Sequence, residues 1–137
     1  MKLAGKIWKS RKSGLWLVEF SLLDLATQAR TKEDIPEMVK DAVEALVDDK
    51  HFSVEVSLYK KFAYLEATDQ RKLISLILKR QRRKRKLTLE EVAQHLNARS
   101  INEYAQYENG EHQPSFEKFE KLLQAIDPAL QPVISCM

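Results

Sequence analysis

The chain has 137 residues, 44% of them hydrophobic, which is enough for one average domain or two small ones with a buried core. Disorder throughout is therefore not expected, and no apolar run approaches the roughly 18 to 20 residues needed to cross a bilayer. The N-terminus lacks the apolar core of a signal peptide, and Cys136 is the single cysteine. We therefore expect a cytoplasmic protein with no internal disulfide.

The net charge of +3 is unevenly distributed along the chain. Residues 1–69 contain eleven Lys/Arg and twelve Asp/Glu, which gives −1, whereas residues 70–137 contain twelve and eight, which gives +4. This asymmetry predicts that the C-terminal half contacts a polyanion and that the first half has another role.

The first residues favour β-structure. Residues 1–9 and 15–20 are rich in aromatic and branched side chains, and the link between them ends in Gly14, which suits a hairpin turn. A third short strand is predicted around Leu25 to Ala29, although its apolar spacing also permits a helix.

The next pattern is that of an amphipathic helix, with an apolar stripe over residues 35–47 and an end near residues 48–49. Pro36 must then lie in the first turn. With Asp34 as N-cap, the proline takes the second helical position, where its missing N–H has no partner in any case. Glu37 then completes an acidic capping box.

Period-2 alternation over residues 52–58 predicts a half-buried strand, and residues 62–67, FAYLEA, predict another. The order of elements is then three strands, a helix and further strands. This order indicates a small α+β domain whose helix packs on one face of the sheet.

A new pattern starts at Thr68-Asp69, and four helices follow. The first continues through the basic run to Lys86, and the last begins after Ser115 as N-cap and carries a strong apolar stripe. We therefore predict an α+β domain over residues 1–68, an all-α domain over residues 69–127 and a tail or small docking segment over residues 128–137.

The two middle helices read as a helix-turn-helix between Leu87 and Gly110. Thr88 with Glu91 and Ser100 with Glu103 each fit the S/T-x-x-E capping box, which marks a helix N-terminus. Half of a small helical bundle is the alternative interpretation. The run KRQRRKRK at residues 79–86 favours DNA binding, because it supplies charge that neutralises phosphate, although such a run can also be a solvated helix face.

The segment from Leu87 to Ile126 resembles the Cro/repressor (XRE) class of helix-turn-helix domain, whose members share an LTxEELA helix, a YENG or IENG ending and a following PS-x-x-x-(F/L) helix. In that class the third helix enters the major groove of double-stranded operator DNA. The resemblance implies base reading by Asn102 and Gln106 and a structural ion pair between Arg82 and Glu108. The expected DNA-binding residues are Arg83, Lys86, Arg99, Ser100, Asn102, Glu103, Gln106 and Asn109.

The first half resembles the HicB antitoxin family, in four motifs. These are Gly5-Lys6-Ile7, Trp16-Leu17-Val18-Glu19, the turn from Thr27 to Glu33, in which Ala29 replaces the usual glycine, and the helix from Met38 to Leu46. The resemblance implies a truncated ribonuclease-H-like α+β fold. It also implies an antitoxin that binds a small HicA-like toxin, an enzyme that cleaves mRNA, and that represses the operon shared with it. Because a helix-turn-helix of the Cro/repressor class usually binds a palindrome as a dimer, we expect at least a homodimer.

The alternatives to an antitoxin are a metal-dependent nuclease and a regulator that senses a small molecule. The carboxylates Glu19, Asp24, Glu33, Asp34 and Asp41 could hold metals for nuclease chemistry, but about 67 residues leave little room for the full fold, and three of these acids fit a helix start or its solvent face. We expect no catalytic residue, metal or cofactor. The alternative function is a stand-alone Cro-type regulator whose first domain senses a small molecule.

Overall fold

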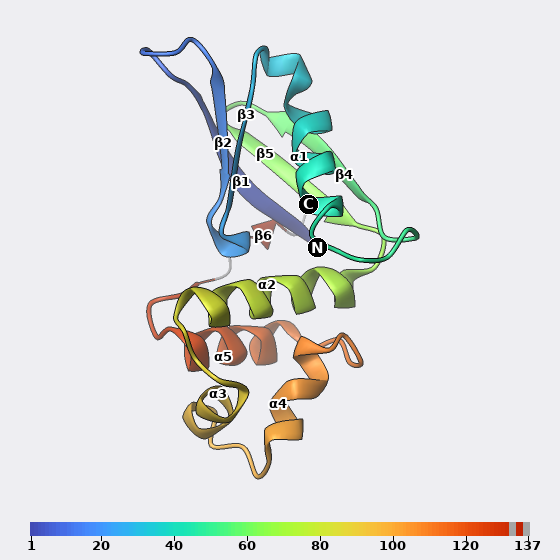
Figure 1. Cartoon of the computed structure of the whole chain (residues 1–137), viewed down its shortest axis with the longest axis vertical. Coiled ribbons are helices and arrows are strands. Elements are labelled where there is room, and N and C mark those ends of the chain that lie inside the picture. The colour runs from blue at the N-terminus through green and yellow to red at the C-terminus, as the bar shows by residue number, and fades with distance from the viewer. Residues whose placement is uncertain (132–133, 136–137) are drawn as a thin grey trace. The chain divides into compact units, whose positions relative to one another are not determined.

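The computed structural model of the chain describes residues 1–131 and the backbone of residues 134–135. It divides into two compact units (Figure 1). The first, called the sheet unit, consists of residues 1–69 together with the short C-terminal strand β6. The second, called the helical unit, begins at Gln70. The fold is α+β, as the sequence predicted.

The sheet unit contains one antiparallel sheet in the order β3-β2-β1-β5-β4, and β6 pairs with the start of β1. Its strands are β1 (Lys2–Lys9), β2 (Trp16–Phe20), β3 (Leu25–Ala29), β4 (Val54–Tyr59), β5 (Phe62–Ala67) and β6 (Ile134–Ser135). The three N-terminal strands form a meander, which confirms the predicted hairpin and the third strand. Gly14 has φ +73° in the first turn, a conformation that glycine adopts without steric penalty.

Alternate residues of β1 to β5 face the side of the sheet that carries helix α1, which packs against β2, β3 and β4 (Figure 1). The core of the unit is formed by apolar side chains on this face, among them Leu3, Ile7, Val18, Phe20, Ala63 and Leu65. Gly5 lies in the same row, where a Cβ atom would come within 2.8 Å of the Phe20 ring. A residue with a side chain at this position would clash with the Phe20 ring, which explains the glycine.

Helix α1 (Ile35–Glu44) corrects two details of the sequence interpretation. A 3-10 turn, η2 (Lys32–Asp34), continues directly into the helix, so Asp34 has helical φ and ψ and its side chain makes no capping hydrogen bond. An N-cap residue needs extended backbone, so the predicted capping box of Asp34 and Glu37 does not form.

The C-terminal end of α1 also differs from the prediction. The helix ends at Glu44, before residues 48–49. After it, backbone N–H groups donate to carbonyls three residues back, as the Leu46 N–H does to the Val43 carbonyl, so the last turn is of the 3-10 type. The Glu44 carboxylate then accepts a hydrogen bond from the Val54 N–H at 3.1 Å. This contact ties the end of the helix to the first residue of β4.

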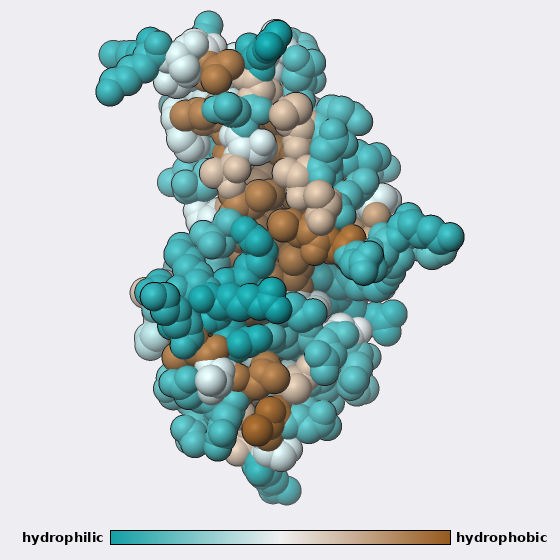
Figure 2. All heavy atoms as spheres, viewed as in Figure 1, coloured by the Kyte–Doolittle hydropathy of each residue, from teal (hydrophilic) through white to brown (hydrophobic). Residues whose placement is uncertain are grey.

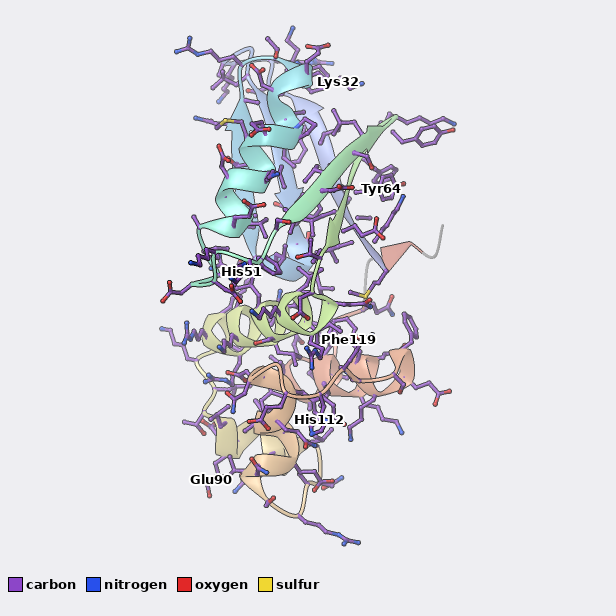
Figure 3. The ribbon with its side chains drawn as sticks, turned by 90° about the vertical axis from the view of Figure 1, so that its right-hand side faces the viewer. Lys32, His51, Tyr64, Glu90, His112 and Phe119 are labelled. Atoms are coloured by element: carbon purple, nitrogen blue, oxygen red, sulfur yellow. The ribbon has the colours of Figure 1, made fainter. Side chains whose placement is uncertain are left out.

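The other face of the sheet has no helix packed on it within the described residues. Trp8 and Phe62 are exposed on it, and the Phe62 ring lies 6.3 Å from that of Tyr64. Figure 3 shows Tyr64 on the side of the sheet that faces away from α1. This surface is called the open face.

The helical unit contains α2 (Gln70–Lys84), α3 (Leu89–His95), α4 (Ile101–Glu108) and α5 (Phe116–Ile126), which are the four predicted helices. Helices α3 and α4 pack against each other, α2 contacts α4 and α5, and α5 also contacts α3. The core is formed by apolar residues of all four, including Leu73, Ile77, Val92, Tyr104, Phe119 and Leu123. Figure 3 labels Phe119 on α5.

The predicted C-terminal tail, residues 128–137, lies partly outside the described residues, at 132–133 and 136–137. Of its described part, β6 adds to the sheet through the pairs Lys2 with Ser135 and Leu3 with Ile134. Among the described residues, no helix combines the length and the apolar character that crossing a membrane requires.

Candidate DNA-binding surface

Helix α3 begins as the sequence predicted. The Thr88 hydroxyl accepts a hydrogen bond from the Glu91 N–H at 3.1 Å, and the Glu91 carboxylate accepts one from the Thr88 N–H at 3.0 Å. This reciprocal capping box fixes the first turn of the helix. Val92 and Ala93 on the next turn are buried and hold α3 against the rest of the unit.

The turn after α3 depends on Asn97, which has φ +58°. The Ala98 N–H donates to the Ala93 carbonyl at 2.9 Å and the Asn97 N–H to that of Gln94 at 3.0 Å, the two bonds of a Schellman motif. Asparagine tolerates this left-handed conformation better than most residues. Asn97 therefore supplies the left-handed residue of this turn, which lacks the glycine common in the Cro/repressor class.

Helix α4 starts differently from the prediction. Ser100 is the N-cap and has extended backbone, but its side chain makes no capping hydrogen bond. Glu103 instead accepts a hydrogen bond from the Arg99 N–H at 2.6 Å, one residue before the cap. The second capping box is therefore wrong in its partners, although the helix begins where it was predicted to begin.

The two sides of α4 have different roles. Tyr104 and Glu108, one turn apart, are buried. Asn102, Gln106 and Asn109 follow the i, i+4, i+7 spacing of a single helix face, and Asn102 and Asn109 are exposed. The Gln106 amide lies back along the helix and donates to the Glu103 carbonyl at 3.2 Å. It must leave this carbonyl to reach a base.

Burial raises the pKa of the Tyr104 phenol, and the negative charge of Glu108 raises it further. The phenol therefore stays protonated. Within the described residues its hydroxyl has no hydrogen-bond partner. Tyr104 thus contributes to the packing of α4 through its ring, and its buried polar atom opposes that contribution.

Glu108 orients α4 through Arg82 of α2. Its carboxylate accepts from Arg82 Nε at 2.9 and 3.0 Å and from Nη2 at 2.6 Å, and Arg82 Nη1 donates to the Leu87 carbonyl at 2.9 Å. The Glu108 side chain is 3% exposed and the Arg82 side chain 15%. The hydrogen bond to Glu108 raises the pKa of Arg82. This arrangement confirms the ion pair that the family resemblance implied.

The basic run divides into internally paired and exposed residues. Arg82 is held by Glu108, and Arg85 forms an ion pair with Asp127 after α5. Arg83 and Lys86 are exposed. Lys86 has φ +57° and closes α2 in a Schellman motif, in which the Leu87 N–H donates to the Arg82 carbonyl at 3.1 Å. The charge available to phosphate is therefore smaller than the run of seven basic residues suggests.

These helices have the order and the ends of a helix-turn-helix, with the polar face of α4 outward and its buried face held by Arg82. Residues 78–127 match the family model described as helix-turn-helix. They form a helix-turn-helix DNA-binding domain. The match covers 50 of 137 residues, which is α2 from Leu78 onward together with α3, α4 and α5.

A search of curated proteins found no relative that matches the chain. The helix-turn-helix domain binds DNA in a sequence-specific manner and makes the protein a transcription regulator. In this class of domain the second helix of the motif, here α4, lies in the major groove. The resemblance to the Cro/repressor class then predicts that the face with Asn102 and Gln106 reads bases and that the backbone around Asn109 and Gly110 lies next to phosphate, and these residue roles stay predictions.

The structure gathers the expected DNA-binding residues on two segments. Arg99, Ser100, Asn102, Glu103, Gln106 and Asn109 lie on α4 or at its ends, and Arg83 and Lys86 lie at the C-terminal end of α2. Glu103 already holds the Arg99 N–H, so it positions the turn. Sequence reasoning missed the role of Asn97, and the asparagine that follows the last turn of α3 was the available signal.

The carboxylates that could hold metals in the enzymatic interpretation belong to the sheet unit. Among the described residues, no group of three or more His, Cys, Asp or Glu side chains is arranged to hold a metal ion.

Proposed function

We propose that the protein is the antitoxin of a type II toxin–antitoxin pair, in which the sheet unit neutralises a HicA-like toxin that cleaves mRNA and the helical unit represses the shared operon. In this proposal the chain is not an enzyme. The observation that carries it is a helix-turn-helix domain joined to a separate compact α+β unit that bears the HicB-like motifs.

The positions of those motifs support the proposal. Gly5-Lys6-Ile7 lies on β1, Trp16-Leu17-Val18-Glu19 on β2, and the segment from Met38 to Leu46 begins within α1. Gly5 has a structural reason to be glycine, because the Phe20 ring fills the space of its Cβ. The motif residues thus build the sheet and its helix cover, and the surfaces beside them are available to a partner.

The test is to purify the tagged full-length chain from its native cells and to identify the small proteins that remain bound by mass spectrometry. The captured protein is then expressed alone and together with the chain. The proposal requires a basic partner of fewer than about 100 residues that arrests growth and whose arrest the chain relieves. A partner without effect on growth refutes toxin neutralisation.

A matched variant separates the two activities. Asn102→Ala/Gln106→Ala changes the base-reading face of α4 and leaves the sheet unit untouched. It should lose repression of a reporter placed behind the operon's own promoter and still relieve growth arrest. Loss of both activities would show that DNA binding and neutralisation are not divided between the units as proposed.

Operator binding by this class of domain commonly uses two copies on a palindrome, so we also propose at least a homodimer on DNA. Sedimentation of the chain with and without operator DNA measures the number of copies. One copy per operator would contradict this part of the proposal.

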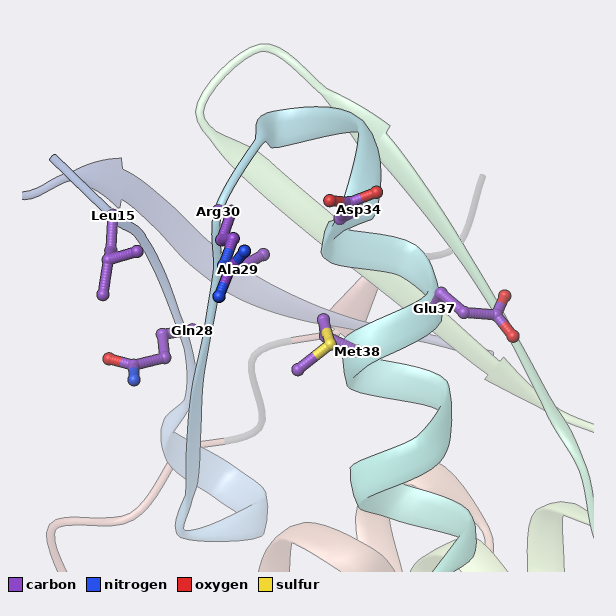
Figure 4. Close-up of a pocket in the computed structure, with 7 residues that line it drawn as sticks. All are labelled: Leu15, Gln28, Ala29, Arg30, Asp34, Glu37 and Met38. Atoms are coloured by element: carbon purple, nitrogen blue, oxygen red, sulfur yellow. The ribbon is translucent and has the colours of Figure 1, made fainter.

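One observation favours the alternative, a regulator whose first unit senses a small molecule. The sheet unit has a cavity of about 620 Å³ beside α1, within the size range of small-molecule sites (Figure 4). In that case a metabolite, and no captured protein, should change the affinity for the operator. Thermal stability measured against a metabolite library tests this alternative.

A further inference from the structure

The cavity of the sheet unit lies between the first turns of α1 and strand β3. Its apolar lining comes from Leu15, Ala29 and Met38. The polar side chains that complete it are Gln28 of β3, Arg30 directly after that strand, Asp34 of η2 and Glu37 of α1. Met38 extends from α1 toward β3 (Figure 4) and is 41% exposed, although it is apolar. Figure 2 shows hydrophobic surface among hydrophilic side chains on the face of the sheet unit that carries α1. This cavity is called the β3–α1 groove.

The groove adjoins a free sheet edge. Strand β3 is the last strand on its side of the sheet, and within the described residues it pairs only with β2. The backbone groups on its outer side are therefore available to another strand. An exposed edge of this kind is a template for an extended segment of another chain, which pairs through its main chain and places alternate side chains in adjacent pockets.

Charge indicates the occupant. The charged side chains that line the groove are Arg30, Asp34 and Glu37, and with Glu33 one residue before Asp34 the acidic side chains number three against one basic side chain. Lys32, in the same segment, lies over the Trp16 ring. Glu33, Asp34 and Glu37 are exposed, and the last two line the groove. A partner segment rich in lysine or arginine complements this surface, and charge complementarity of this kind increases the association rate and the specificity of binding.

From the free edge, the apolar groove and the acidic rim together, we infer that β3 and the β3–α1 groove bind an extended, basic segment of the partner protein. The segment adds a strand to the sheet at β3 and places an apolar side chain against Met38. This inference rests on the proposed function and names the surface through which the sheet unit would hold its toxin.

A second copy of this chain fits the same surface less well. If two copies paired β3 with β3 about a two-fold axis, each would bring its own Glu33, Asp34 and Glu37 to the contact, and these like charges would repel. A small molecule could fill the groove, but it would not form the row of main-chain hydrogen bonds that the outer edge of β3 offers. A basic polypeptide uses the edge, the groove and the charge together.

The test uses the full-length chain and random peptides of about 12 residues displayed on phage, a length that spans a strand such as β3. Selection should enrich sequences in which Lys or Arg alternates with apolar residues. One enriched peptide, synthesised with a fluorescent label, is then titrated with the chain, and Met38→Ala/Glu37→Lys should weaken its binding roughly tenfold or more. Both residues are exposed, so the double variant should keep the wild-type circular dichroism.

The control variant is Phe62→Asp, on the open face, which should leave peptide affinity unchanged. Amide hydrogen exchange supplies the second measurement, because strand addition protects outer-edge amides of Leu25–Ala29 when the peptide binds. Loss of affinity in Phe62→Asp, unchanged affinity in Met38→Ala/Glu37→Lys, or unchanged exchange over β3 would each overturn the inference. Failure to enrich any basic peptide would overturn it as well.

The growth assay distinguishes failure of this inference from failure of the proposed function. If Met38→Ala/Glu37→Lys still relieves growth arrest fully, the chain is an antitoxin that uses another surface, and the inference is wrong. If the peptide binds at the β3–α1 groove but no captured partner arrests growth, the binding surface stands and the antitoxin function does not.

Discussion

Arg82→Met should destabilise the helical unit strongly, because it leaves the Glu108 carboxylate buried without its cation. Glu108 is 3% exposed and receives three hydrogen bonds from Arg82, while Arg82 also holds the Leu87 carbonyl at the end of α2. Methionine keeps much of the volume of the arginine stem, so the main loss is that of charge and hydrogen bonds.

Removal of one partner from a fully buried ion pair costs about 3 to 5 kcal/mol. Arg82 is 15% exposed, so water can reach part of the site, and we expect the lower end of that range, about 3 kcal/mol. A loss of this size is a large fraction of the roughly 5 to 15 kcal/mol by which domains are stable. The same substitution frees α4 from α2, so operator affinity should fall as well.

The assay is urea unfolding of the full-length chain, followed both by tryptophan fluorescence and by circular dichroism. Trp8 and Trp16, the two tryptophans, both lie in the sheet unit, so their fluorescence reports on that unit, whereas helical circular dichroism comes mainly from α2 to α5. Arg82→Met should shift the dichroism transition and leave the fluorescence transition in place.

Arg85→Met is the matched control. Arg85 lies three residues further along the chain, directly after the last residue of α2, and pairs with Asp127. It is 47% exposed, so solvent screens this pair and its loss should cost no more than about 1 kcal/mol. Equal losses in the two variants, or a loss below about 1 kcal/mol in Arg82→Met, would refute the view that burial makes the Glu108 pair structural.

Four further substitutions test other parts of the structure. Asn102→Ala and Gln106→Ala should each weaken operator binding by about 1 to 3 kcal/mol and leave binding to scrambled DNA nearly unchanged, as measured by fluorescence anisotropy; equal losses on both DNAs would contradict base reading. Lys86→Gly should remove a left-handed lysine and raise stability by about 0.5 to 1 kcal/mol, while the salt dependence of DNA binding falls by about one counterion; an unchanged slope would show that Lys86 does not contact phosphate. Tyr104→Phe should leave stability unchanged or raise it by up to about 1 kcal/mol, because it removes a buried hydroxyl that has no partner among the described residues, and a clear loss in thermal unfolding would reveal one.

Most elements were predictable, since strands and helices follow from periodicities that are local in sequence. The Thr88 and Ser100 boxes show the limit of such local rules. Both have the same spacing, but only Thr88 forms the reciprocal bonds. At the start of α4 the Glu103 carboxylate instead accepts a hydrogen bond from the Arg99 N–H, in the turn that follows Asn97. The S/T-x-x-E motif therefore predicts where a helix begins, but the conformation of the preceding turn determines which backbone N–H the glutamate binds.

Contacts between residues far apart in sequence were not predictable from local pattern. Arg85 and Asp127 are 42 positions apart, and each alone is an ordinary surface charge, so only the packing of α5 beside α2 reveals the pair. This pair changes the electrostatic interpretation of the basic run, because a charge neutralised within the protein releases fewer counterions from DNA. The β3–α1 groove has the same origin: Leu15, Ala29 and Met38 belong to separate segments, and the local pattern of each segment does not indicate that the three side chains meet. Local pattern therefore predicts the elements that carry each surface, whereas the charge and the apolar contacts that a partner meets are set by how those elements pack.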